Sequence, residues 1–348
     1  MDSIPYGVLA ALAGLIGGAV LGLSARLGNF CTLGALETAV YGGSQQRLRL
    51  WGIVLAVAIS GTFLGVQTGS IRLMDTFYHQ IEWNPWASIV GGLLFGYGMA
   101  LAGNCGFGAL VRFGGGDLRS LVVVVVMGLF SFITLSGPLA PVRVALFEQV
   151  TARSEQGITA TVQAMTGVPP LACALIIAAA FLVWALAHGP LRRAPAEIAW
   201  GVVAGVAVVW SLWATSWLNT ESFGEIGVEG LSFTAPVGRT LIYLMTSTAG
   251  GLNFSVGAVG GVMAGALAGS LWRGMFRWEA CEDPRELGRQ VGGAALMGIG
   301  GVIALGCSVG QGVSAFATLA WSAPVTLAAI CAGAVFGLRG LIGLAQAD

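Results

Sequence analysis

The sequence predicts an all-α polytopic membrane protein with about nine transmembrane helices plus short re-entrant helices. Only 9% of its 348 residues are charged, whereas soluble proteins average about 25%. Hydrophobic residues make up 56%, and the mean hydropathy is +0.84. The apolar runs are close to the roughly 20 residues that span a bilayer as a helix. These three observations together indicate a protein embedded in the membrane.

Each predicted span is an apolar run with few charges. The spans are residues 5–24, 50–69, 86–103, 118–137, 168–187, 197–217, 237–272, 290–306 and 322–343. No basic stretch precedes residues 5–24, so this run is read as a span and not as a signal peptide. Residues 237–272 count once, as a helix broken near Gly250-Gly251-Leu252-Asn253; two short spans are the alternative.

Arginine alternates between the predicted loops, and positive charge gathers on the cytoplasmic side of membrane proteins. The arginine-rich loops contain Arg47, Arg49, Arg112, Arg119, Arg192, Arg193 and Arg273–Arg289. The loops between them are acidic, with Asp75, Glu82 and Glu221–Glu229. This pattern predicts an external N-terminus and a cytoplasmic C-terminus.

Two short motifs recur along the chain. Asn29-Phe30-Cys31 returns as Asn253-Phe254-Ser255, and Gly103–Gly108 returns loosely as Leu305–Gly310. Paired breaks in two halves of a chain are typical of transporters built from inverted repeats. The sequence therefore predicts one transmembrane transport domain over residues 1–348. Its pseudo-symmetric inverted halves are about 5–136 and 197–345, joined on the outer face by a polar connector at 137–167.

Three of the six cysteines interrupt apolar runs beside Gly or Asn: Cys31, Cys105 and Cys307. Each precedes a short segment, so each is expected at the N-terminus of a short re-entrant helix. Helix N-termini favour anions. A single free cysteine is more often a small buried hydrophobe, but three such placements favour a substrate pathway. Cys173 and Cys331 are expected to be packing residues, and Cys281 an exposed thiol.

Other residues near the breaks are predicted to support the pathway. They are Asn29, Gly34, Gly103, Gly106, Gly108, Asn253, Ser255, Gly306, Gly310 and Gln311. Charged residues at membrane depth are functional candidates by default, and here they are Arg26, Glu37, Arg112 and Arg239. Glu37 is a candidate partner for Arg26 or Arg112. Ser255 is expected to border the path without holding the sulfur atom.

Several function classes lack their residues in this chain. All cationic side chains are arginine, so a lysine Schiff-base or lysine-nucleophile enzyme is excluded. His79 and His188 are the two histidines, a poor supply of transition-metal ligands. No Gly-x-x-x-x-Gly-Lys-Ser/Thr motif is present. We therefore expect no catalytic residue, metal, cofactor or nucleic-acid partner.

The motifs Asn29–Ala35, Gly103–Ala109 and Gly306–Gly312 resemble the cysteine motifs of the YeeE/YedE family of bacterial inner-membrane sulfur transporters. The resemblance covers nearly the whole chain. It implies a nine-span monomer that imports thiosulfate along Cys31, Cys105 and Cys307, and a cytoplasmic TusA-like sulfur-carrier protein as partner. After the second cysteine, many relatives carry a hydroxyl or charged residue where this chain has Gly106-Phe107-Gly108. That departure leaves the exact sulfur or selenium substrate open.

Two other functions fit the same residues. A membrane thiol enzyme would relay sulfane sulfur between the cysteines as persulfides. A soft-metal channel would use them as thiolates, although no Met or His cluster lies near the motifs. A thiol is a weak, soft hydrogen-bond donor, which suits the terminal sulfur of thiosulfate better than a hard oxygen. A thiosulfate importer is therefore the leading hypothesis.

Overall fold

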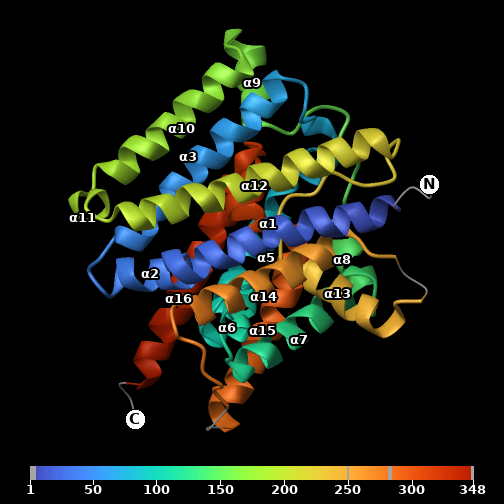
Figure 1. Cartoon of the computed structure of the whole chain (residues 1–348). Coiled ribbons are helices and arrows are strands. Elements are labelled where there is room, and N and C mark those ends of the chain that lie inside the picture. Colours follow the sequence, from blue (N-terminus) through green and yellow to red (C-terminus); the bar gives the residue numbers. More distant parts are fainter. Residues whose placement is uncertain (1–4, 249–250, 281–283, 346–348) are drawn as a thin grey trace.

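A computed structural model describes residues 5–248, 251–280 and 284–345 of the chain. In these residues the secondary structure is helical, and β-pairing is limited to isolated bridges (Figure 1). Cys281 and Gly250 lie outside the described residues. The all-α architecture agrees with the prediction.

The long helices are α1 (Tyr6–Gly28), α3 (Gln46–Gln67), α5 (Pro85–Ala102), α7 (Leu118–Leu135), α10 (Pro170–Leu186), α12 (Pro195–Glu221), α14 (Phe254–Trp272), α15 (Pro284–Ile303) and α16 (Ser322–Ala345). The short elements are α2 (Thr32–Val40), η1 (Leu73–Asp75), α4 (Phe77–Gln80), α6 (Gly106–Gly114), α8 (Ala140–Leu146), α9 (Ile158–Thr166), α11 (Gly189–Arg192), α13 (Ala235–Thr246) and the π-helix η2 (Gly310–Ala315).

The chain is a multi-pass membrane protein. Within the described residues, seven helical segments are long and apolar enough to cross a bilayer, and an eighth is added if α9 and α10, which meet at 120°, count as one span. Helix α15 is not among them and carries charges in its first turns. The count of nine stays a prediction.

Two of the short helices follow the long helices directly. By length and apolar composition, α2 and α1 together form one candidate span, Tyr6–Val40, and α6 and α5 together form another, Pro85–Gly114. The re-entrant course of the short helices after Cys31 and Cys105 stays a prediction.

Glycine allows the central helices to approach each other closely. Helices α1 and α14 run parallel, because Gly7 faces Leu252 and Gly22 faces Val262. A Cβ atom on Gly257 would collide with the Ala11 carbonyl of α1. Small residues at helix interfaces are the usual means of tight packing in membranes, and here they hold α1 against α14.

Helices α5 and α15 make crossed contacts at four glycines. A Cβ atom built on Gly91 would lie 2.8 Å from the Gly300 oxygen, and one on Gly98 would lie 2.5 Å from the Gly293 oxygen. If Gly91 corresponds to Gly293 and Gly98 to Gly300, each contact is the two-fold image of the other. These are the contacts that two inverted repeats would make.

The larger packing pairs show the same exchange between the two halves. Helix α1 of the first half packs on α14 of the second, and α12 of the second half packs on α3 of the first. In the same way, α5 packs on α16 and α15 packs on α7. The connector holds α8 and α9, and α10 lies on the outer side of α3 (Figure 1). The repeat boundaries at 5–136 and 197–345 remain our proposal, and this exchange supports it.

The break expected inside residues 237–272 has another form. Helix α13 is a separate short helix packed on α7 and α14, and α14 is long enough to cross alone. Asn253 caps α14 near the start of α1, while Cys31 follows the far end of α1. The two Asn-Phe motifs therefore lie at opposite ends of a parallel helix pair. Their sequence likeness does not reflect equivalent places, because Phe254 opens a full span and Thr32 a short helix.

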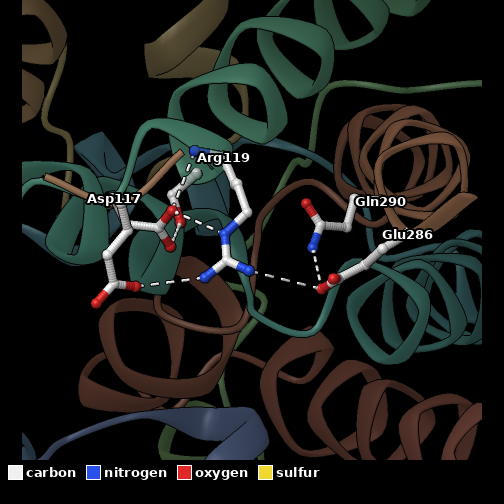
Figure 2. A network of polar contacts seen from close by, with 6 residues as sticks. Asp117, Arg119, Glu286 and Gln290 are labelled. Atoms are coloured by element: carbon white, nitrogen blue, oxygen red, sulfur yellow. Dashed lines mark hydrogen bonds and ion pairs between the residues drawn. The ribbon is translucent and has the colours of Figure 1, made fainter. Parts of the chain in front are cut away.

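A polar network marks the end of the molecule where α7 and α15 begin. Arg119 pairs with Asp117 at 3.3 Å, with Glu279 at 3.4 Å and with Glu286 at 4.0 Å (Figure 2). Gln290 donates a hydrogen bond to Glu286. Each exposed pair contributes little alone, but the set ties the loop after α14 to the starts of both helices.

Candidate functional site

The backbone adopts the same left-handed conformation shortly before each of the three predicted cysteines. A residue in the left-handed region lies two positions before each thiol: Asn29 with φ 53°, Gly103 with φ 73° and Leu305 with φ 58°. Each follows the last residues of a long helix. A left-handed residue ends a helix, so the next helical segment starts afresh at the cysteine.

Cys105 and Cys307 share a second detail. The Gly108 N–H donates to Sγ of Cys105 at 3.3 Å, and the Gly310 N–H donates to Sγ of Cys307 at 3.4 Å. Both thiols are fully buried. At Cys105 the sulfur therefore takes the place of an N-cap oxygen at the start of α6, and at Cys307 it accepts the first N–H of η2.

Cys307 has further partners on the loop of residues 222–234, which the sequence analysis treated as an acidic loop and did not link to the site. The Phe233 N–H donates to the sulfur at 3.3 Å, and Ser232 Oγ lies 3.7 Å from it. The Phe233 ring packs against Phe107, with centroids 5.1 Å apart. The loop thus touches both central breaks. Two apolar residues among acidic and small ones, Leu231 and Phe233, were the sequence signal that part of this loop is buried, and both are buried.

Cys31 and Cys105 are neighbours. A Cβ atom on Gly108 would lie 3.4 Å from Sγ of Cys105 and 3.8 Å from Sγ of Cys31, and the two side chains interact. Cys31 is half-buried, while Cys105 is not accessible. Of these two neighbouring thiols, Cys105 is therefore the inner one and Cys31, at the start of α2, the outer one.

Buried polar atoms without ordinary partners lie beside the thiols. Ser308 faces Cys105, and in the described residues neither its Oγ nor Oδ1 of Asn104 has a hydrogen-bond partner. Ser308 is 0% exposed and Asn104 4%. Buried polar groups are normally satisfied, so this interior has unused hydrogen-bonding capacity between Cys307 and Cys105.

A cavity of about 140 Å³ opens on the Cys307 side. Its lining includes Tyr78, Glu229, Ser232, Arg239 and Gly306. Burial, followed by the nearby Cys307 and Glu229, raises the pKa of Tyr78 above its ordinary value. The phenol stays protonated and keeps a hydrogen to donate.

The predicted charged residue on this side is Arg239. It pairs with Glu229 at 2.9 Å and donates to Ser255 Oγ at 3.3 Å, and Ser255 donates to Glu229 at 3.1 Å. Sequence analysis missed Glu229 as a site residue and treated it only as a loop charge. Ser255 is thus hydrogen-bonded to two side chains that line the cavity, Arg239 and Glu229.

The surroundings of Cys31 are basic. The Arg47 guanidinium lies 3.1 Å from a Cβ position on Gly34, which also neighbours Cys31. Arg112 is close enough for its charge to act on Cys31, and Arg26 lies over Gly115.

The pairing considered for Glu37 is not found. Glu37 is exposed and makes no ion pair with Arg26 or Arg112 among the described residues. It lies in the second half of α2, away from the buried helix start where pairing would be strong.

Several predicted supporting residues hold the breaks in shape. Gln311 donates to the Ala304 and Leu305 carbonyls at the end of α15, and Asn253 caps α14 through Val256 N–H. A Cβ atom on Gly106 would lie 2.5 Å from Sδ of Met127. These residues build the backbone around the thiols.

The remaining described cysteines are elsewhere. Cys173 is in α10 and Cys331 in α16. Within the described residues, no three His, Cys, Asp or Glu side chains gather as metal ligands would.

Long apolar helices that end at Asn, Gly or Leu just before short helices are typical of one class of multi-pass membrane transporters. A family model described as sulphur transport matches residues 27–336, so this chain belongs to that family, YeeE/YedE. The chain is 26% identical over 325 residues to the thiosulfate transporter TsuA of Escherichia coli (strain K12), covering 89% of this chain and 88% of the relative. It is 27% identical over 329 residues to the thiosulfate transporter TsuA of Spirochaeta thermophila, covering 90% and 94%. Its relatives are named as transporters and not as enzymes.

Proposed function

We propose that this chain imports thiosulfate, or a closely related sulfur anion, past Cys307, Cys105 and Cys31 in that order. The observation that carries the proposal is the succession of these thiols. They come from three distant parts of the sequence, and they follow one another from the neighbourhood of a cavity through the interior to the arginines beside Cys31. The names of the curated relatives support the same substrate.

The chemistry of the path fits an ion with one soft and one hard end. Thiols are weak, polarisable donors suited to a terminal sulfur. The unpartnered Ser308 hydroxyl can donate a hydrogen bond to the oxygens. Half-helix N-termini favour an anion without a fixed cation. Weak successive sites let the ion leave as well as enter.

We assign the cavity side to the outside of a bacterial inner membrane and the Cys31 mouth to the cytoplasm. Arginine alternation supports an external N-terminus and a cytoplasmic C-terminus. A cytoplasmic TusA-like carrier would then receive sulfur at the basic mouth formed by Arg47 and Arg112.

The test is uptake of labelled thiosulfate by the purified full chain in liposomes. We expect saturable uptake that excess unlabelled thiosulfate inhibits more strongly than sulfate does. Equal inhibition by sulfate, or uptake no faster than in empty liposomes, would contradict the proposal. Intact mass after turnover provides a second readout, because a persulfide relay would leave added sulfur on a cysteine and passage of the ion would not.

A further inference from the structure

The cavity on the Cys307 side contains one charge of each sign among its described lining residues, Arg239 and Glu229. The cavity ends close to the first thiol, since Ser232 and Gly306 line it and Ser232 Oγ is 3.7 Å from the buried Cys307 sulfur. The charged pair therefore lies in the same cavity as the residues next to Cys307.

The geometry of the pair leaves Arg239 occupied by a carboxylate. Its Nη1 is 2.9 Å from Oε1 of Glu229, and Ser255 Oγ holds Oε2 at 3.1 Å. The side chains of Arg239 and Glu229 are 41% and 33% exposed. Arginine recognises carboxylates and other oxyanions through the same N–H groups. Glu229 thus lies where the oxygens of a substrate anion would bind.

We propose that Arg239 is the entry site for the substrate oxyanion and that Glu229 is its built-in competitor, which the substrate displaces. This inference rests on the proposed function and concerns recognition outside the thiol path. Half-exposed ion pairs are weak, so a dianion can break this one. The tethered carboxylate has a high effective concentration at Arg239, so a monovalent anion such as chloride competes poorly. Glu229 would then make the entry selective for dianions.

A purely structural role for the pair is the competing explanation. Glu229 would then only fix loop 222–234 against α13 and α14. Glu229→Gln separates the two roles, because it keeps the shape and hydrogen bonding of the side chain and removes the charge that competes with substrate. Glu225→Gln is the matched control, since it removes an exposed carboxylate from the same loop.

The experiment measures initial rates of thiosulfate uptake into liposomes over a range of thiosulfate and chloride concentrations. For Glu229→Gln we expect KM to fall and chloride to inhibit at lower concentration, each by about twofold to tenfold, the range that a weak exposed pair allows. Arg239→Gln should raise KM by about tenfold or more, and adding Glu229→Gln to it should produce no further change. Glu225→Gln should match the wild type.

An unchanged or raised KM in folded Glu229→Gln, with unchanged chloride inhibition, would overturn the inference. If that variant does not fold, Glu229→Asp provides the same test, because a shorter carboxylate reaches Arg239 less well and should shift both quantities in the same direction. Wild-type protein without thiosulfate uptake would refute the proposed function itself. Wild-type uptake with an unaffected Glu229 series would refute only the entry site.

Discussion

The breaks at Cys105 and Cys307 share one backbone design and have different surroundings. In both, a left-handed residue ends a long helix, and the thiol two positions later accepts the N–H of the third residue on. Cys307 then receives a further N–H from Phe233 of loop 222–234, whereas Cys105 faces the thiol of Cys31. The design supplies a buried sulfur at a helix start, and the neighbours decide what the sulfur meets next.

This difference gives the path a direction. The sulfur of Cys307 is held by backbone donors beneath a cavity, and the sulfurs of Cys105 and Cys31 form a pair that ends at arginines. Phe233 links the two breaks through its N–H on Cys307 and its ring on Phe107. The following predictions test how far the two breaks are alike.

Removal of any of the three thiols should have the largest effect. Cys31→Ala, Cys105→Ala and Cys307→Ala each remove one of the successive sulfur sites, and we expect uptake to fall by about tenfold or more, which corresponds to at least about 1.4 kcal/mol. Liposome uptake with matched protein amounts is the measurement. Cys173→Ala and Cys331→Ala are the controls, because these thiols lie in α10 and α16 away from the breaks. Equal uptake by all five variants would remove the thiol path.

Labelling from outside the cell should reach the loop before Cys307 and should not reach the loop between α10 and α12. Phe223 is 99% exposed in the loop that leads to Cys307, and Arg192 is exposed in the loop between α10 and α12. An impermeant maleimide applied to intact cells should label Phe223→Cys and leave Arg192→Cys unlabelled. The parent protein measures background labelling of the native cysteines, and the opposite pattern would invert the orientation.

Alanine at Gly310 and at Gly108, the glycines three residues after Cys307 and Cys105, should affect the packing of the two breaks differently. A Cβ atom on Gly310 would lie 2.6 Å from Ser232 Oγ, so Gly310→Ala must push loop 222–234 away from Cys307. We expect it to destabilise the protein by about 1–3 kcal/mol, as overpacking does, and to reduce uptake strongly.

A Cβ atom on Gly108 makes only ordinary contacts with Cys105 and Cys31. Gly108→Ala should therefore keep its melting temperature and lose a few-fold of uptake, because the methyl group occupies space between the thiols. Melting in detergent, compared with uptake, checks both variants. A destabilised Gly108→Ala protein with intact Gly310→Ala would reverse the comparison.

Mild acid should lower the stability of the folded protein through His79, the neighbour of Tyr78 in the cavity lining. This side chain is fully buried, and burial lowers the pKa of His79 from 6.5 to about 4. Below pH 6.5 the unfolded chain binds a proton that the folded protein does not bind. Stability should therefore fall as the pH drops from 6.5 towards 4, by up to about 3 kcal/mol.

Melting temperatures from pH 7 to pH 4 check this prediction. His79→Gln should flatten the dependence relative to the wild type, while His188→Gln, at a partly exposed position, should leave it unchanged. A wild-type slope in His79→Gln would show that other groups cause the acid sensitivity.

Much of the architecture was readable from the sequence because hydropathy and glycine act locally. Apolar run lengths predicted most of the helices that are long and apolar enough to cross a bilayer, although α15 is not among them and the count of nine stays a prediction. Gly or Asn beside Cys31, Cys105 and Cys307 marked where helices stop.

The rest depended on three-dimensional arrangement. Asn253-Phe254-Ser255 copies the letters of Asn29-Phe30-Cys31, but helix direction places the two motifs at opposite ends of α1 and α14. Loop 222–234 carries charges and small residues like any surface loop, and only tertiary packing brings Phe233 to Cys307. The partner of Arg239 lies ten residues earlier in that loop, a contact that no helical spacing predicts.

The most direct test of the central claim is substrate protection of the interior thiols. Purified protein would be treated with a small neutral alkylating reagent in the presence of thiosulfate, sulfate or neither, and modification of each cysteine followed by peptide mass. We predict that thiosulfate slows alkylation of Cys307, Cys105 and Cys31, that sulfate protects far less, and that Cys173 and Cys331 react equally in all three conditions. Equal protection by sulfate and thiosulfate, or none by thiosulfate at these three cysteines, would contradict the account.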